Sequence, residues 1–94
     1  MKINQIKNGM KNIEIEAKVI EKSKEKTVLT RYGEKRVADI VLEDETGKIK
    51  ASLWEDQIDR FKVGDKVKIS GAYSTEFRNN VQLNIPKKGK IEKL

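Results

Sequence analysis

A chain of 94 residues is long enough for one small domain and too short to build a second hydrophobic core. It contains no cysteine and no histidine, which excludes a disulfide framework, a thiolate metal site and the commonest general base. A net charge of +6 favours a polyanionic partner, nucleic acid before an anionic membrane surface, and a charged surface kept for solubility or heat resistance is the alternative.

Nothing in the sequence indicates a membrane protein. No run approaches the ~20 apolar residues that a bilayer span requires, and the first residues do not resemble a signal peptide. A soluble, cytoplasmic protein that does not contact membrane is therefore expected.

Alternating side chains predict the first strands. Apolar and charged residues alternate through residues 12–22, and residues 36–44 are rich in β-branched side chains. The basic segment between them, residues 22–36, is expected to be a loop or the tip of an extended hairpin.

A tight turn and a short helix come next. The sequence DETG, residues 44–47, is typical of a turn in which the Asp44 side chain bonds to nearby backbone. Residues 48–54 alternate again, so residues 36–54 are predicted to form a β-hairpin. In residues 55–61 the apolar side chains lie three apart behind acidic ones, which predicts a short helix.

Two more strands are predicted in the last third of the chain. The fourth lies within residues 62–71 and the fifth at residues 81–85, with a loop expected at residues 75–80. The basic tail that follows, residues 87–94, has two apolar residues that could dock on the body of the domain, Ile91 and Leu94.

The order of these elements predicts an all-β fold. Five strands with a short helix between strands three and four is the arrangement of the OB-fold, a five-stranded, partly open barrel. Residues 1–94 are therefore expected to be one OB-fold domain with a core at about residues 10–86. An SH3-like barrel usually lacks the helix, and a ferredoxin-like domain would need two long helices.

The lone tryptophan lies on the polar side of the third predicted strand. Alternation places Trp54 with Lys48, Lys50 and Ser52, opposite apolar residues such as Leu53. A single Trp in a small domain is more often part of the core, but here the inward face is already apolar. An aromatic ring among ammonium groups suits a stacked base and its phosphate, and such stacking contributes ~1–3 kcal/mol per base.

Tyr73 and Phe77 are further candidates for stacking. Counting from Ile69 places Tyr73 on the core face, but a bulge at Gly71 would turn it outward, and alternation alone leaves both positions open. Phe77 lies among polar residues, which favours the surface over packing against a barrel end.

Basic and polar residues surround these aromatics. In an OB-fold, the loop after the first strand and the loop between strands four and five flank the binding face. The alternative for such a charged loop is a solvated surface. The predicted polar and phosphate-binding residues are Lys26, Arg31, Tyr32, Arg36, Lys48, Lys50, Ser52, Arg78, Asn79, Gln82 and Asn84.

Residues 37–84 resemble the short archaeal single-stranded-DNA-binding proteins and the related OB-fold domains of replication protein A. The most specific stretch is DETGKIKASLW, followed by VGDKVKISGAYSTEFRNNVQLN, and the resemblance extends more loosely from about residue 10. It implies that Trp54, Tyr73 and Phe77 stack on successive bases, and it favours the bulge at Gly71. The family position matching Tyr73 is often Trp.

The expected function is binding of single-stranded DNA with little sequence preference, which would protect it in replication, recombination or repair. Neither catalysis, a cofactor nor a metal is expected, and other OB-fold subunits or repair proteins are expected as partners. Three alternatives stay open: an RNA-binding OB-fold, a structural subunit whose face a partner protein covers, and a metal-dependent nuclease at the acidic clusters.

Overall fold

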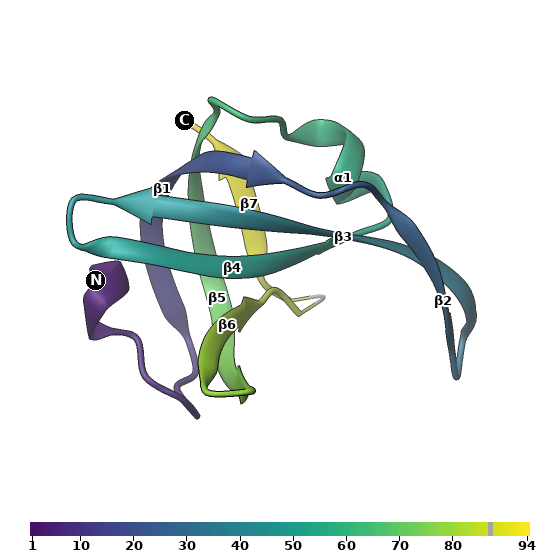
Figure 1. Ribbon diagram of the computed structural model, residues 1–94, viewed down its shortest axis with the longest axis horizontal. Helices are drawn as coiled ribbons and strands as arrows, with labels where there is room; N and C mark the ends of the chain where they lie inside the picture. Colours follow the sequence, from purple (N-terminus) through teal and green to yellow (C-terminus); the bar gives the residue numbers. More distant parts are fainter. Residues whose placement is uncertain (87) are drawn as a thin grey trace.

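The computed structural model describes residues 1–86 and 88–94, so Lys87 of the predicted tail lies outside the described residues. Strands account for most of the fold, as predicted (Figure 1). In chain order the elements are η1 (Ile3–Gln5), β1 (Ile13–Lys22), β2 (Lys26–Thr30), β3 (Gly33–Asp44), β4 (Gly47–Trp54), α1 (Asp56–Arg60), β5 (Lys66–Phe77), β6 (Asn80–Asn84) and β7 (Lys90–Lys93).

Five of the strands close a ring. The order is β1-β3-β4-β6-β5, and β5 pairs with β1 to complete it; β4 and β6 are parallel and the other pairs are antiparallel. Inward side chains such as Ile40, Leu53 and Leu83 are fully buried and fill the interior. The five predicted strands and the helix between the third and fourth are thereby confirmed.

The basic segment after β1 forms a hairpin rather than an irregular loop. β2 pairs with the first part of β3, and these residues, 26–37, form an arm that projects beyond the ring (Figure 1). At its tip the Thr30 hydroxyl donates to the carbonyl of Gly33 at 2.8 Å and accepts from the amide of Tyr32 at 3.1 Å. The hairpin alternative for this segment is therefore the correct one.

A bulge in β5 reverses the direction of its later side chains. Gly71 has a φ of 69°, and the register between β5 and β1 shifts beside it. The next buried residue after Ile69 is therefore Ala72, and Tyr73 points outward. A Cβ on Gly71 would lie 3.1 Å from the Cα of Gly89, so glycine is needed for both conformation and space.

The loop predicted at residues 75–80 is wrong in extent. β5 continues to Phe77 and β6 begins at Asn80, so only Arg78 and Asn79 form the turn. Both have positive φ, 52° and 67°, as in a type I′ turn, which matches the twist of the strands it joins. The segment is therefore a continuous hairpin that can present side chains at fixed positions.

The two ends of the chain pack against the ring. β7 pairs with β5 and buries Ile91, as predicted, whereas the Leu94 side chain stays exposed and only its amide binds, donating to the carbonyl of Lys66 at 2.8 Å. At the other end, Ile3 and Ile6 join the hydrophobic core, ahead of the core's expected start near residue 10.

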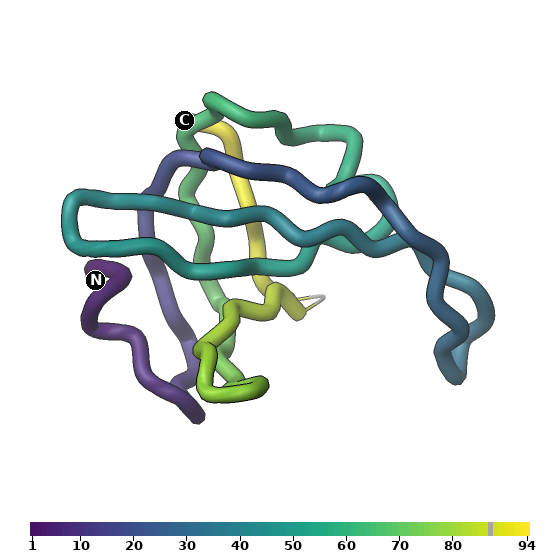
Figure 2. Tube along the Cα trace, viewed as in Figure 1, coloured from purple at the N-terminus to yellow at the C-terminus, as the bar shows by residue number. Residues whose placement is uncertain are grey.

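The N-terminal segment, purple in Figure 2, lies beside the β3–β4 turn, and hydrogen bonds hold it at two places. The Asp44 carboxylate accepts hydrogen bonds from the amides of Ile3, at 2.8 Å, and Thr46, at 2.7 Å. Burial acts to raise the pKa of Asp44. Hydrogen bonds from Thr46 and from the amides of Ile3 and Gly47 outweigh this effect, so the pKa is lowered. Further along, the buried hydroxyl of Ser74 accepts from the amide of Met10 at 2.9 Å.

Candidate nucleic-acid interface

The outward side of β3, β4, β6 and the end of β5 carries most of the predicted site residues. Strand pairing sets them in rows: Asp39, Ser52, Asn84 and Tyr73 in one, and Val41, Lys50, Gln82 and Thr75 in the next. We call this surface the sheet face; it also includes Glu43, Lys48, Trp54, Phe77 and Asn80.

The three predicted stacking residues are all exposed on the sheet face. Trp54 ends β4, Phe77 ends β5, and Tyr73 lies between them in the row of Ser52. Their exposed fractions are 38%, 61% and 40% for Trp54, Phe77 and Tyr73. Successive outward residues of a strand lie roughly 7 Å apart, so the rings are spread along the face rather than packed together.

Hydrogen bonds hold several polar side chains of the sheet face. The Ser52 hydroxyl donates to Oδ1 of Asp39 at 3.1 Å, and Nδ2 of Asn84 donates to the hydroxyl of Thr75 at 3.0 Å. Such bonds between neighbouring strands fix rotamers, so these groups are pre-arranged before a ligand arrives.

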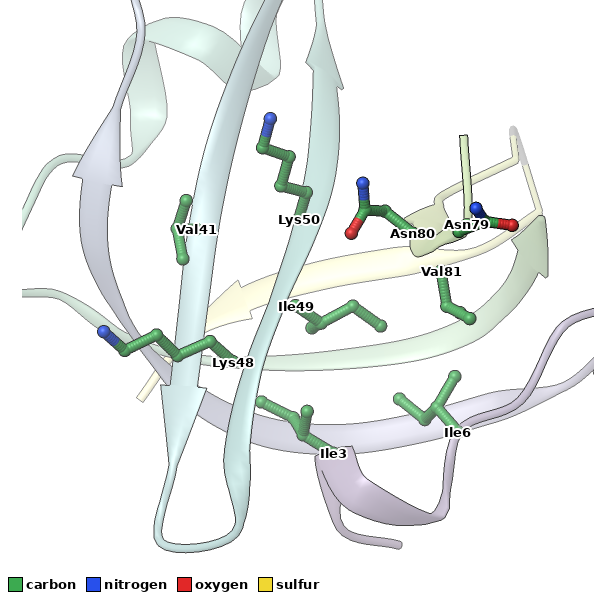
Figure 3. Close-up of a pocket in the computed structure, with 9 residues that line it drawn as sticks. All are labelled: Ile3, Ile6, Val41, Lys48, Ile49, Lys50, Asn79, Asn80 and Val81. Carbon is green, nitrogen blue, oxygen red and sulfur yellow. The ribbon is translucent and has the colours of Figure 1, made fainter. Parts of the chain in front are cut away.

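Lys50 lies between two hollows of this surface. The first, about 460 Å³, lies beside η1 and is bordered by Lys48, Lys50 and Asn80 (Figure 3). The second, about 530 Å³, lies toward β1 and includes Asp39 and Val63. In residues 1–86 and 88–94, Lys50 forms no ion pair, so its charge is available to an anion.

The base of the arm adds one more cation to this face. Lys26 pairs with Val37, which in turn pairs with Trp54 on the other side. Residues opposite one another in antiparallel strands share a face, so Lys26 lies two strands from the indole. Lys26 therefore lies on the same side of the sheet as Trp54.

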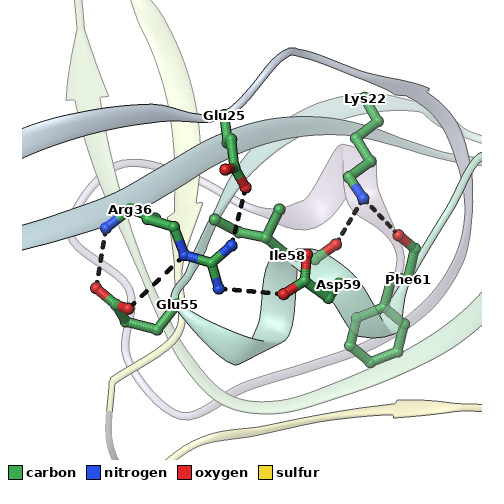
Figure 4. Close-up of polar contacts among 7 residues, drawn as sticks. All are labelled: Lys22, Glu25, Arg36, Glu55, Ile58, Asp59 and Phe61. Carbon is green, nitrogen blue, oxygen red and sulfur yellow. Dashed lines mark hydrogen bonds and ion pairs between the residues drawn. The ribbon is translucent and has the colours of Figure 1, made fainter.

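Arg36, predicted to bind phosphate, has a different environment. It shares its direction with the buried Ala38, away from the sheet face. Its guanidinium contacts the carboxylates of Glu25 and Asp59, each at 3.1 Å, and of Glu55 at 4.0 Å (Figure 4). The hydrogen bond and charge of Asp59 raise the pKa of Arg36, with Glu25 and Glu55 adding to the effect. Arg36 is thus a cation that ties the arm to α1.

The end of β4 that bears Trp54 is anchored by its neighbours. Glu55 has a φ of 53° and a ψ of −125°, a strained conformation for a residue other than glycine. Its amide donates to the carbonyl of Arg36 at 3.0 Å, and its carboxylate accepts from the amide of Arg36 at 2.9 Å. The ammonium group of Lys22 donates to the carbonyl of Phe61 at 2.9 Å and so caps the C-terminal end of α1 (Figure 4). These contacts hold the backbone of Trp54 in place.

The remaining predicted residues lie at two separate tips. Arg31 and Tyr32 occupy the turn of the arm, where the Tyr32 ring is 78% exposed. Arg78 lies at the turn after β5, with its guanidinium 5.2 Å from the centre of the Phe77 ring. Asn79 borders the first hollow. The arm tip lies away from the ring of strands in Figure 1, so the structure does not bring Arg31 and Tyr32 together with the sheet face.

Sequence reasoning missed Asp39 as a member of this surface. The turn at residues 44–47 defines the register of the β3–β4 hairpin, and counting back from it places Asp39 opposite Ser52. The position of this turn in the sequence was therefore sufficient to place Asp39 on the sheet face.

The metal-dependent nuclease alternative would require a metal site among the acidic side chains. In the described part of the chain, no group of three or more acidic, Cys or His side chains is arranged to hold a metal ion. Within residues 1–86 and 88–94, no helix is long and apolar enough to cross a membrane.

The closed ring of five strands and the short helix α1 between β4 and β5 define an OB-fold. Residues 6–93 match the family model described as single-stranded DNA binding protein Ssb-like, OB fold, and the chain belongs to this family. It is 33% identical over 90 residues to the single-stranded DNA binding protein Ssb of Saccharolobus solfataricus. The match covers 96% of this chain and 61% of that relative, so the chain spans about three fifths of the relative's length.

Solved structures share the fold. The OB domain of a Thermoplasma acidophilum protein superposes with a TM-score of 0.86 at 21% identity, covering 100% of this chain and 85% of that one. The replication Factor A related protein of Methanobacterium thermoautotrophicum gives 0.83 at 23% identity, covering 100% and 89%. The predicted OB-fold is confirmed.

Proposed function

We propose that this protein binds single-stranded DNA across the sheet face by stacking bases on Trp54, Tyr73 and Phe77. The observation that carries the proposal is the exposure of three aromatic rings on one polar sheet surface whose opposite side is the core. Every base has a π-face, so this arrangement would hold a strand with little regard to sequence. Membership of a family described by single-stranded DNA binding supports the proposal.

Phosphate contacts would come from cations on and beside the sheet face. Lys26, Lys48, Lys50 and Arg78 border the path between the rings, and binding would release the counterions condensed on the strand. Ser52, Gln82, Asn84 and Asn79 would supply hydrogen bonds. Arg31 and Tyr32 would contact the DNA only if the DNA strand extends past Trp54 and along the arm. Arg36 has no phosphate role in this proposal, because three carboxylates surround it.

In the cell this activity would protect exposed single strands in replication, recombination or repair. The named relative in Saccharolobus solfataricus is a single-stranded DNA binding protein, and a replication protein A heterotrimer bound to single-stranded DNA contains the same fold, with a TM-score of 0.79 at 23% identity. We therefore propose single-stranded DNA as the ligand and other OB-fold chains as partners.

The test uses the intrinsic fluorescence of the one tryptophan. Oligo-dT added at low salt should quench Trp54 fluorescence in a saturable way, and the affinity should fall steeply as salt rises. A length series would give the number of nucleotides covered, and oligo-rU in parallel would measure the preference for DNA over RNA. Absence of saturable quenching with either polymer would contradict the proposal and favour a face covered by a partner protein.

A further inference from the structure

Asp39 places a carboxylate among the stacking residues. It is two residues from Val37, the partner of Trp54, so its side chain is the diagonal neighbour of the indole on the same face. Diagonal neighbours in an antiparallel pair lie ~7–8 Å apart, which is within reach of an aromatic side chain or of a base stacked on one. An acid at this position would lie beside a base that covers Trp54.

The position of this carboxylate is well defined. The amide of Asp39 donates to the hydroxyl of Ser23 at 2.9 Å, and the amide of Ser23 donates to the carbonyl of Asp39 at 2.8 Å. The Ser52 hydroxyl binds Oδ1 at 3.1 Å. Within residues 1–86 and 88–94, Oδ2 receives no hydrogen bond and the carboxylate forms no ion pair.

A negative charge here works against phosphate binding. It repels the backbone of a nucleic acid, and the backbone bonds of Asp39 to Ser23 do not require a carboxylate. The side chain is half-buried beside Ser52 on the sheet face and borders the second hollow, which Lys50 also borders. The chemistry that fits a fixed acceptor in this place is a donor on a base edge.

We infer that Asp39 reads the base stacked on Trp54 and favours guanine, an inference that rests on the proposed function. A carboxylate only accepts hydrogen bonds and can accept two side by side. The Watson–Crick edge of guanine presents N1–H and N2–H next to each other, which matches the two oxygens. Thymine presents one N3–H between two carbonyl oxygens, which the carboxylate repels. Stacking then supplies affinity for any base, and Asp39 adds a preference at one position.

The experiment compares dT octamers that differ in one central base, measured by fluorescence anisotropy of a 5′-labelled strand. The octamer with one dG should bind the unaltered protein roughly 5- to 20-fold more tightly than the octamer of dT alone. Inosine lacks the N2 amino group and should give an intermediate affinity. The preference is expressed as the ratio of the affinities for the dG and dT octamers. A change in electrostatic attraction that affects both octamers equally does not alter this ratio.

Asp39→Asn is the decisive variant. Asn keeps an oxygen for Ser52 but replaces the free acceptor with a donor, so the dG-to-dT ratio should fall to about 1 while binding to dT becomes tighter, because the repulsion of phosphates and thymine carbonyls is removed. Glu43→Gln is the matched control, because Glu43 lies on the same face beside Lys48, further from Trp54; its ratio should not change.

Three results would overturn the inference. An equal affinity of the unaltered protein for the dG and dT octamers, or a ratio that Asp39→Asn leaves intact, would contradict base reading by Asp39 and leave the proposed function standing. A failure of all octamers to bind would contradict the proposed function, and this inference with it.

Discussion

The sheet face and the arm both expose aromatic and basic side chains, but they are supported in different ways. The sheet face rests on fully buried residues such as Leu53 and Leu83, and its strands have neighbours on both sides. The arm consists of β2 paired with β3, with Leu29 83% exposed near its tip. The aromatic side chains of the sheet face are therefore positioned by the core beneath them, whereas the arm is joined to α1 at its base by the exposed ion pairs of Arg36.

This difference suggests that the sheet face and the arm contribute differently to binding. Aromatic side chains that are already held in place lose little conformational entropy when a base stacks on them. The sheet face should therefore contribute most of the binding free energy. A two-stranded hairpin such as the arm is only marginally stable by itself, so it can adjust its position to a flexible DNA strand. The predictions below separate the two regions, from the largest expected effect to the smallest.

Removing core volume should affect one region far more than the other. Leu53→Ala deletes a fully buried side chain next to Trp54 and should lower the free energy of unfolding by ~2–5 kcal/mol. Leu29→Ala in the arm should change it by less than about 0.5 kcal/mol, because Leu29 is exposed. Urea unfolding followed by circular dichroism measures both. A large loss for Leu29→Ala would show that the arm is packed in solution.

Removing one ring from each region should rank their contributions to binding. Trp54→Ala should weaken binding of oligo-dT by ~1–3 kcal/mol with little change in melting temperature, because the indole is exposed on the sheet face, where stacking is proposed, and does not fill the core. Tyr32→Ala at the arm tip should weaken it less. Anisotropy of a labelled oligomer suits both variants. If the Tyr32 variant lost more affinity, the arm would be the main binding surface.

The turn that joins two strands of the sheet face, β3 and β4, should make the stability of the fold sensitive to acid. The pKa of Asp44 is lower in the folded chain than in the unfolded one, so this carboxylate stabilises the fold above the unfolded value of roughly 3.9. That contribution should be lost as pH falls through the unfolded value toward the folded pKa. Asp44→Asn should flatten the acid limb of a plot of melting temperature against pH. An unchanged acid limb would contradict the shift.

Arg36→Gln should loosen the arm while leaving the sheet face intact. Loss of the contacts to Glu25 and Asp59 should speed hydrogen exchange of the β2 amides with little change at β4 and β6. Arg31→Gln is the control, since Arg31 forms no ion pair within residues 1–86 and 88–94. Equal exchange in the two variants would mean that the ion pairs do not position the arm.

The sequence was most informative where local chemistry determines register. The turn at residues 44–47 sets the pairing of β3 with β4, and from that pairing the outward position of Trp54 follows directly. The helix at Asp56–Arg60 is also within one residue of its expected ends, because its apolar spacing and acidic start are local features.

Features that depend on contacts between distant segments, or on an unusual backbone conformation, are harder to predict from the sequence. Glu25, Glu55 and Asp59 meet at Arg36 only after the strands and α1 are in place. The two-residue turn after Phe77 was mistaken for part of a loop, because Arg rarely adopts the positive φ that a type I′ turn requires. Alternation alone left the direction of Tyr73 open, because the effect of a bulge at Gly71 on later side chains depends on pairing with β1.

The most direct test of the account is a nuclear magnetic resonance titration of the ¹⁵N-labelled protein with oligo-dT. Binding across the sheet face predicts that the indole N–H of Trp54 and the amides of β4, β6 and the second half of β5 shift together at stoichiometric DNA, while those of β1 and β7 stay near their free positions. Shifts confined to the arm, or spread over β1 and β7 with an unmoved indole signal, would contradict it.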